Sequence, residues 1–207
     1  MNETASKTDA GGAGDEFIAA TRTWLEKAVI GLDLCPFAKP VHASNRIRFA
    51  VSFAATPEAL LEDLVRELMA LAGAEAATVE TTLLIHPRVL NDFADYNDYL
   101  DVVDAALEEL GLDGVLQVAS FHPQYRFEGT APDDIDNFTN RSPYPTLHLL
   151  REDSIERAVA AHPDTAGIFE KNIETLRRLG RDGWRALGLD ADSAGNMRET
   201  ESFDPKR

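Results

Sequence analysis

The feature that most constrains the fold of this chain is an alternation of strand-like and helix-like segments. Strands are expected at 47–54, 79–85, 115–121 and 146–150. Between and around them, apolar residues recur at the three- and four-residue steps of amphipathic helices, at 15–32, 56–73, 91–111, 153 onward and 168–180. This order predicts an α/β fold built from βαβ units, with a single sheet that is mostly parallel or ferredoxin-like and with further helices near both ends.

Helix ends are marked by specific residues. Thr56 as N-cap with Pro57 at the first helical position opens one helix, and Asn91 or Asp92 opens the next, which ends near Gly111. The 47–54 strand has one less buried face, which suits an edge strand. Two prolines predict an extended loop at 34–40, and Gly180 predicts the end of the last long helix.

The chain has 207 residues, enough for one domain with a substantial core. We expect flexible tails at 1–14 and 189–207, where apolar residues are too few to offset the entropy of ordering, and a single domain at 15–188. Residues 122–145 are rich in Pro, Asp and Asn and are long for a connection, which is typical of functional or mobile loops.

Charge and cysteine content limit the function classes. Twenty Lys and Arg against 36 Asp and Glu give a net charge of −16, which disfavours nucleic-acid and membrane partners and favours a small-molecule ligand. Cys35 is the one cysteine, so no internal disulfide is expected, and this suits a reducing compartment. Without a signal-like or membrane-spanning segment, the sequence predicts a soluble cytoplasmic protein, and it does not determine the oligomeric state.

Two histidines occupy equivalent positions after two expected strands. His86 and His122 each follow a strand and precede a proline, so parallel neighbouring strands would bring the imidazoles together. With His148 on the later strand they would form a site for a divalent transition metal such as zinc or iron. The alternative is that these histidines are loop and core hydrogen-bonding groups, as the similar His162-Pro163 pair between two helices suggests.

Cys35 is a second candidate catalytic residue, as a nucleophile or ligand, with a buried structural thiol as the alternative. The long loop and the strand after it supply candidate substrate-binding residues, because an arginine fork suits a carboxylate or phosphate. These residues are Arg141, Asn140, Arg151 and Tyr144. The loop aspartates, Asp133, Asp134 and Asp136, are interpreted either as ligands of a hard cation or as turn and cap formers.

Five strings resemble the family known as domain of unknown function 1415, over about residues 21–184. They are WLEKAVIGL at 24–32, LCPFAKP at 34–40, ETTLLI at 80–85, LQVASFHP at 116–123 and TNRSPYP at 139–145. The resemblance implies a single-domain soluble protein of bacterial type, in which Cys35, His86, His122 and the segment 140–142 belong to the family pattern. It implies no activity.

The leading hypothesis is therefore an enzyme that acts on a small anionic metabolite at the carboxyl ends of the strands. His122 would be its general base or a metal ligand, assisted by His86, His148 and Cys35, and Arg141 would orient the substrate. The alternative is a non-catalytic module that binds a ligand or a protein.

Overall fold

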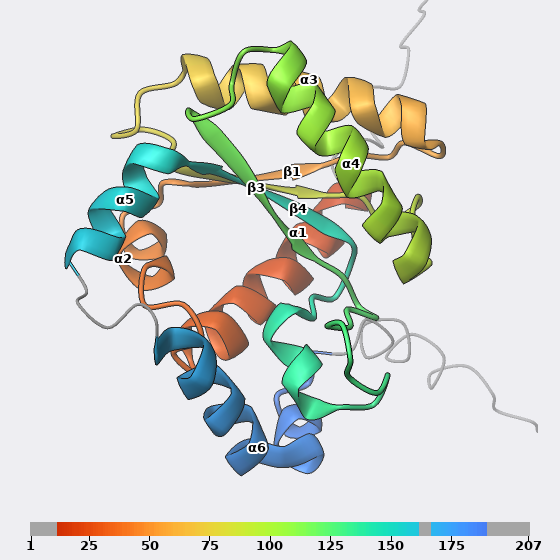
Figure 1. Ribbon diagram of the computed structural model, residues 1–207, viewed down its shortest axis with the longest axis vertical. Coiled ribbons are helices and arrows are strands. Elements are labelled where there is room, and N and C mark those ends of the chain that lie inside the picture. Colours follow the sequence, from red (N-terminus) through yellow and green to blue (C-terminus); the bar gives the residue numbers. More distant parts are fainter. Residues whose placement is uncertain (1–11, 162–166, 190–207) are drawn as a thin grey trace, which may run out of the picture.

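The computed structural model describes residues 12–161 and 167–189, and the α/β fold expected from the sequence is confirmed. Four strands form one mixed sheet in the order β1-β2-β4-β3 (Figure 1). The strands are β1 (Ile47–Val51), β2 (Thr81–Ile85), β3 (Leu116–Phe121) and β4 (Thr146–Arg151). Strand β1 lies at one edge, as its half-exposed pattern predicts.

Strands β2 and β3 are not direct neighbours, contrary to the expectation from the sequence. Strand β4 lies between them and is antiparallel to both, pairing Leu83 with His148 on one side and Ala119 with His148 on the other. Strands β2 and β3 therefore run in the same direction, and their carboxyl ends lie at one edge of the sheet without being adjacent. The long loop after β3 makes this possible, because it carries the chain back to enter the sheet between the two earlier strands.

Two helices cover one face of the sheet, and both begin as the sequence predicts. Helix α3 (Pro57–Gly73) is capped by Thr56, whose side chain accepts a hydrogen bond from the Ala59 amide. Helix α4 (Phe93–Glu109) is capped by Asp92. Their apolar stripes pack with the sheet into a core that includes fully buried Leu60, Leu64, Leu68, Tyr96 and Leu147.

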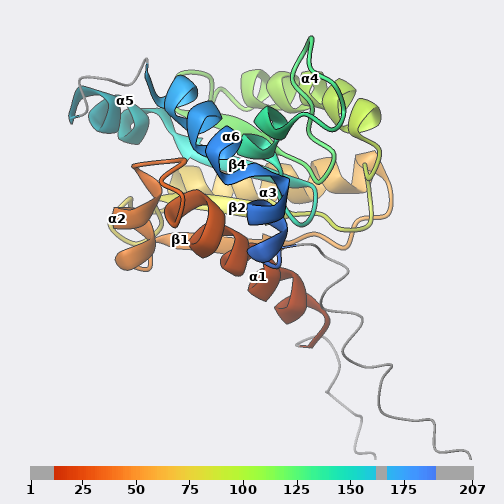
Figure 2. The ribbon, with the colours of Figure 1, turned by 90° about the horizontal axis from the view of Figure 1, so that it is seen from below.

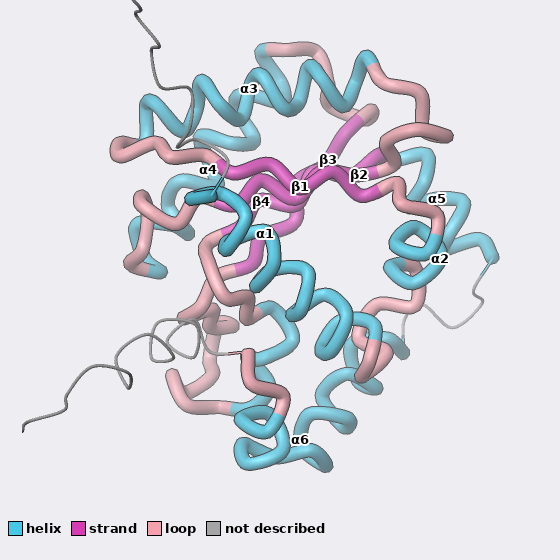
Figure 3. The backbone as a smooth tube through the Cα atoms, turned by 180° about the vertical axis from the view of Figure 1, so that it is seen from behind, coloured by secondary structure: helices cyan, strands magenta, loops and turns pink. Residues whose placement is uncertain are grey.

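The opposite face is covered by helices near the two ends of the chain (Figure 2). They are α1 (Gly12–Trp24), continued by the π-helix η1 (Leu25–Ile30), and α6 (Ile168–Ala186). Trp24, Leu176 and Trp184 are the large buried residues of this second core. Figure 3 shows the strands between α3 on one side and α1 and α6 on the other.

Some local predictions need correction. Residues 12–14 are helical, so the predicted N-terminal tail is too long there; most of both predicted tails, and His162, lie outside the described residues. Residues 38–43 form helix α2 (Ala38–Ala43) instead of an extended loop, since Pro40 lies in a first turn that needs no amide donor. Helix α5 (Glu152–Ala161) begins just after β4. Gly180 has a φ of 68°, which kinks α6 where the sequence predicted its end.

Candidate functional site

A pocket of about 420 Å³ lies between the first turn of α4 and the loop that follows β3. Because α4 follows β2, both walls continue from the carboxyl ends of strands, where ligands bind in open α/β sheets. Its apolar lining comes from Phe93, Ala94 and Pro132. Its polar lining comes from Asp92, Gln124, Arg126, Asp133 and Arg141. The volume is within the usual range for small-molecule pockets, about 300–1,000 Å³.

Arg141 is the one predicted substrate-binding residue that lines this pocket, and it is held firmly. Its Nη2 donates to the Pro132 carbonyl at 2.6 Å and its Nε donates to the Tyr125 carbonyl at 3.4 Å. The guanidinium also lies over the Phe138 ring, 4.2 Å from the centroid. Burial and the nearby charge of Arg181 lower the pKa of Arg141 from its ordinary value, and it stays cationic because that value lies far above neutrality.

Arg126 lines the same pocket but is exposed and makes no hydrogen bond or ion pair with any residue that the structure describes. A guanidinium presents five N–H donors in a planar fork, which matches the geometry of a carboxylate or a phosphate. The pocket therefore contains one fixed arginine and one arginine whose donors are available.

Two aspartates also line the pocket. One Asp92 oxygen accepts the amide hydrogens of Ala94, at 2.8 Å, and of Asp95, at 3.3 Å, as the N-cap of α4. Asp133 is bound on one oxygen by Arg181 of α6, at 3.2 Å. Within 12–161 and 167–189, neither carboxylate forms an ion pair with Arg126 or Arg141.

His122 lies behind the pocket and connects its two walls. Its Nε2–H donates to the Leu90 carbonyl at 3.1 Å, and its Nδ1 accepts the Gln124 amide hydrogen at 3.0 Å. The residue is fully buried, with its ring against Phe93 and Tyr96. Burial lowers its pKa, partly offset by the Leu90 bond and the charge of Asp92. With both nitrogens bonded to the backbone, His122 is arranged to position the pocket walls.

His86 binds the same segment between β2 and α4 that His122 binds. Its Nδ1–H donates to the Val89 carbonyl at 3.1 Å, and its ring stacks on Tyr96 with centroids 5.7 Å apart. The Nε2 atom is buried and has no partner among the described residues. Burial lowers the pKa of His86 to about 4, and the nearby His122 adds to the shift, so the ring is neutral at pH 7. Consecutive carbonyls, of Val89 and Leu90, are thus bound by the two histidines.

His148 is on the other face of the sheet. Its neighbours Leu147 and Leu149 pack in the core under α3 and α4, so the alternation of a strand directs His148 toward Phe121 and the opposite core. The Thr81 hydroxyl donates to the Leu149 carbonyl, so the His148 Nε2–H donates to the Thr81 oxygen at 2.8 Å. Burial lowers the pKa of His148 to about 4.

The structure therefore does not bring His86, His122 and His148 together as metal ligands. Strand β4 lies between β2 and β3, the strands that precede His86 and His122. His122 has both ring nitrogens bonded, and His148 points to the opposite face of the sheet. Across the residues that the structure describes, no group of three or more His, Cys, Asp and Glu side chains is arranged to hold a metal ion. The described residues therefore offer no set of ligands for the predicted zinc or iron ion.

Cys35 lies away from the pocket, half-buried against the core formed by α1, η1 and α6. Burial raises the pKa of its thiol, which outweighs the lowering by the backbone amides of Phe37 and Ala38. A raised pKa reduces the thiolate fraction at neutral pH, and the thiolate is the nucleophile. This environment favours the structural alternative for Cys35.

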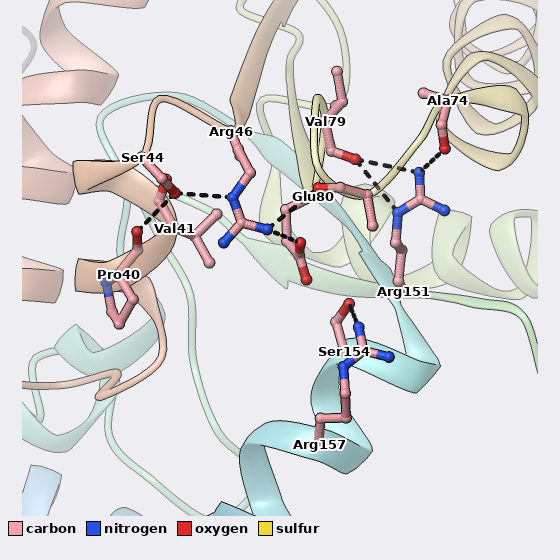
Figure 4. A network of polar contacts seen from close by, with 11 residues as sticks. Pro40, Val41, Ser44, Arg46, Ala74, Val79, Glu80, Arg151, Ser154 and Arg157 are labelled. Atoms are coloured by element: carbon pink, nitrogen blue, oxygen red, sulfur yellow. Dashed lines mark hydrogen bonds and ion pairs between the residues drawn. The ribbon is translucent and has the colours of Figure 1, made fainter.

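Three other predicted substrate-binding residues have structural contacts instead. Arg151 donates to the carbonyls of Leu71, Ala74 and Val79 and so caps the end of α3. Figure 4 shows the bonds to Ala74 and Val79. The Asn140 amide donates to the Ser120 carbonyl, and Tyr144 packs edge-on against Phe17 at 4.9 Å. None of the three lines the pocket.

The loop aspartates act as a cap and as ion-pair partners; the sequence had offered turn and cap formation as one alternative, but not the ion pairs. Asp136 is buried and accepts two hydrogen bonds from Arg177 of α6, at 2.6 and 3.0 Å. Asp134 caps the short 3-10 helix η2 (Ile135–Asn140). With the Asp133–Arg181 pair, these contacts hold the long loop against α6 and fix the wall that carries Arg126 and Arg141.

Six pocket residues were not predicted from the sequence as site residues: Asp92, Phe93, Ala94, Gln124, Arg126 and Pro132. One signal was available, since the start of α4 and the loop after β3 both follow strand ends, where pockets form. Nothing in the sequence showed that Arg126 has no partner among the described residues, because that depends on how the loop packs.

The fold and this pocket define an α/β protein with a ligand-sized site at the carboxyl ends of its strands. The chain belongs to the family described as Protein of unknown function (DUF1415), whose model matches residues 16–186. Comparison with curated proteins and with solved structures gave no match. Among the described residues, no helix is long and apolar enough to cross a membrane.

Proposed function

We propose that this protein binds a small anionic molecule in the pocket between α4 and the loop after β3, with Arg126 and Arg141 as its cationic groups. The observation that carries the proposal is the guanidinium of Arg126, which lines the pocket without a carboxylate partner among the described residues. In a chain with a net charge of −16, an arginine with its donors open to a pocket is a specific feature. It provides the local positive charge that an anion needs.

The contacts of the histidines favour ligand binding over the general-base hypothesis. A general base needs a lone pair within reach of the proton it removes. The lone pair of His122 is already occupied by the Gln124 amide, and that of His86 is enclosed in the core. We therefore assign both residues a positioning role: they hold the segment that leads into Asp92 and Phe93, and His122 also holds Gln124.

The proposed ligand is a free small molecule in the cytoplasm. The single cysteine suits a reducing compartment, and the acidic chain disfavours polyanionic partners such as nucleic acid and anionic membrane surfaces. A carboxylate with a short apolar tail suits the pocket best, since the arginines would bind the charged end and Phe93 and Pro132 the tail.

Isothermal titration with 4-methylpentanoate tests the proposal. We expect saturable binding to the wild type, weakened in Arg126→Gln by about fivefold, as expected for one exposed charge–charge contact of about 1 kcal/mol. Arg157→Gln is the matched control, because Arg157 is an exposed arginine of α5 outside the pocket and the net charge changes equally. Equal affinities for Arg126→Gln and Arg157→Gln, or no binding to the wild type, would overturn the proposal.

A further inference from the structure

We infer that the ligand of this pocket is a zwitterion with the pattern of an α-amino acid, carrying an ammonium group as well as a carboxylate and an apolar side chain. This inference rests on the proposed function, since it takes the same pocket and the same arginines. It adds the second charge of the ligand and the residues that recognise it.

The lining carries charges of both signs. Arg126 and Arg141 contribute two positive charges, and Asp92 and Asp133 contribute two negative charges, of which that of Asp133 is shared with Arg181. A pocket specialised for a simple anion has little use for two carboxylates, because like charges repel the ligand. A ligand with both signs of charge can be attracted by all four groups.

Among the described residues, these opposite charges form no ion pairs with one another. Asp133 is close enough to Arg141 to affect the pKa of that guanidinium, yet no ion pair joins either aspartate to either arginine in the part of the chain that the structure describes. The opposite charges around the pocket therefore remain apart, with space for a ligand between them.

Each aspartate has one oxygen that accepts no hydrogen bond from the described residues. Asp92 uses Oδ1 for both amide hydrogens of the first turn of α4, so its Oδ2 can accept from an ammonium group. Asp133 similarly uses Oδ1 for Arg181 and keeps Oδ2. An ammonium group offers three donors, and the Gln124 side chain at the same pocket adds an amide oxygen that can accept one.

The apolar lining supplies the last element. Phe93 is half-buried and lines the pocket together with Pro132 and Ala94, so part of the wall is hydrocarbon. Burying an apolar side chain against this wall favours binding, because apolar surface is removed from water. Leucine is a suitable probe because it combines both charges with a branched apolar side chain.

The test compares three compounds with the same carbon skeleton: leucine, 4-methylpentanoate, which lacks the amino group, and 3-methylbutylamine, which lacks the carboxylate. We expect leucine to bind about fivefold tighter than 4-methylpentanoate, the value for one additional exposed charge contact. The amine is expected to bind more weakly than leucine, since it cannot use the arginines.

The decisive variant is Asp92→Asn. Asparagine is as good an N-cap as aspartate, so the variant keeps the start of α4 while removing the negative charge. We expect it to reduce the preference for leucine over 4-methylpentanoate and to raise the affinity for 4-methylpentanoate, because a like charge has been removed from the lining. Asp133→Asn is the second variant and is expected to act in the same direction.

The outcomes separate the two proposals. If 4-methylpentanoate binds as tightly as leucine and Asp92→Asn and Asp133→Asn do not distinguish them, the zwitterion inference is wrong and anion binding stands. If none of the three compounds binds to the wild type, both proposals fail. Leucine binding that is lost in Arg126→Gln and weakened in Asp92→Asn supports both.

Discussion

Leu90 and Gln124 are bonded to opposite nitrogens of one imidazole, that of His122. Leu90 leads into the first turn of α4, and Gln124 begins the loop after β3, so a single buried side chain holds both walls of the pocket at a fixed separation. Leu90 has a φ of 57°, a conformation that a leucine rarely adopts unless its surroundings hold it there. The bond to its carbonyl is one such restraint.

We predict that His122→Ala lowers the free energy of unfolding by about 2–4 kcal/mol, because two partly buried backbone groups lose their partner and a fully buried ring is removed. Urea denaturation measures the effect. His42→Ala is the control: His42 is half-buried and contacts Glu26 at the surface, so its loss is expected to cost less than about 1 kcal/mol. Equal stability of wild type and His122→Ala would contradict the positioning role.

Protonation of His86 is expected to destabilise the folded protein at acid pH. Its pKa is about 4 in the folded protein, against an ordinary value of about 6.5, so the unfolded chain binds more protons between these values. The stability from a neutral His86 is fully present above pH 6.5 and falls as the pH is lowered toward 4, by roughly 3 kcal/mol in total.

Because carboxylates titrate in the same window, the test follows His86 itself. The NMR shift of its ring carbon Cε1 should titrate with a midpoint near 4 in the folded protein. A midpoint near 6.5 would show that the ring is not held in a buried, neutral state.

Arg151 is expected to affect stability and not ligand affinity. Arg151→Lys keeps the charge but replaces a fork that reaches three carbonyls with a single ammonium group, so we expect a loss of about 1.5–3 kcal/mol. Denaturant unfolding measures this loss, and titration with 4-methylpentanoate should give the wild-type affinity. If the folded Arg151→Lys variant bound 4-methylpentanoate more weakly than the wild type, Arg151 would be part of the binding site.

Cys35 is expected to react slowly, since burial raises its pKa and limits access to the thiol. At pH 7.5, alkylation by iodoacetamide should be roughly tenfold slower in the native protein than in urea-unfolded chain. Cys35→Ser should also bind 4-methylpentanoate normally. Fast alkylation of the native protein, with lost binding in Cys35→Ser, would identify a functional thiol instead.

Local signals predicted most of the secondary structure. The Thr56-Pro57 pair and Asp92 mark helix starts that the structure confirms, because a cap depends only on residues within one turn. Gly111 likewise follows the end of α4 with a φ of 65°. The short helix α2 was missed, since a proline in the first turn is compatible with both an extended segment and a helix.

The site depended on pairings that are distant in sequence. The position of β4 between β2 and β3 is set by the return of residues 122–145, and no local pattern encodes it. His86 and His122 both pack on the ring of Tyr96, although β4 separates the two strands that precede them. Arg141 and Arg151 were both predicted to bind substrate from their residue type, yet only Arg141 lines the pocket.

The most direct test of the central claim is an amide NMR titration of the wild type with 4-methylpentanoate, with assigned resonances. We expect saturable shifts concentrated at Ala94, Gln124 and Arg126, and much smaller shifts under the same titration in Arg126→Gln. Saturable shifts confined to another part of the molecule, or no shifts at millimolar ligand, would contradict the proposal that this pocket binds a small anion.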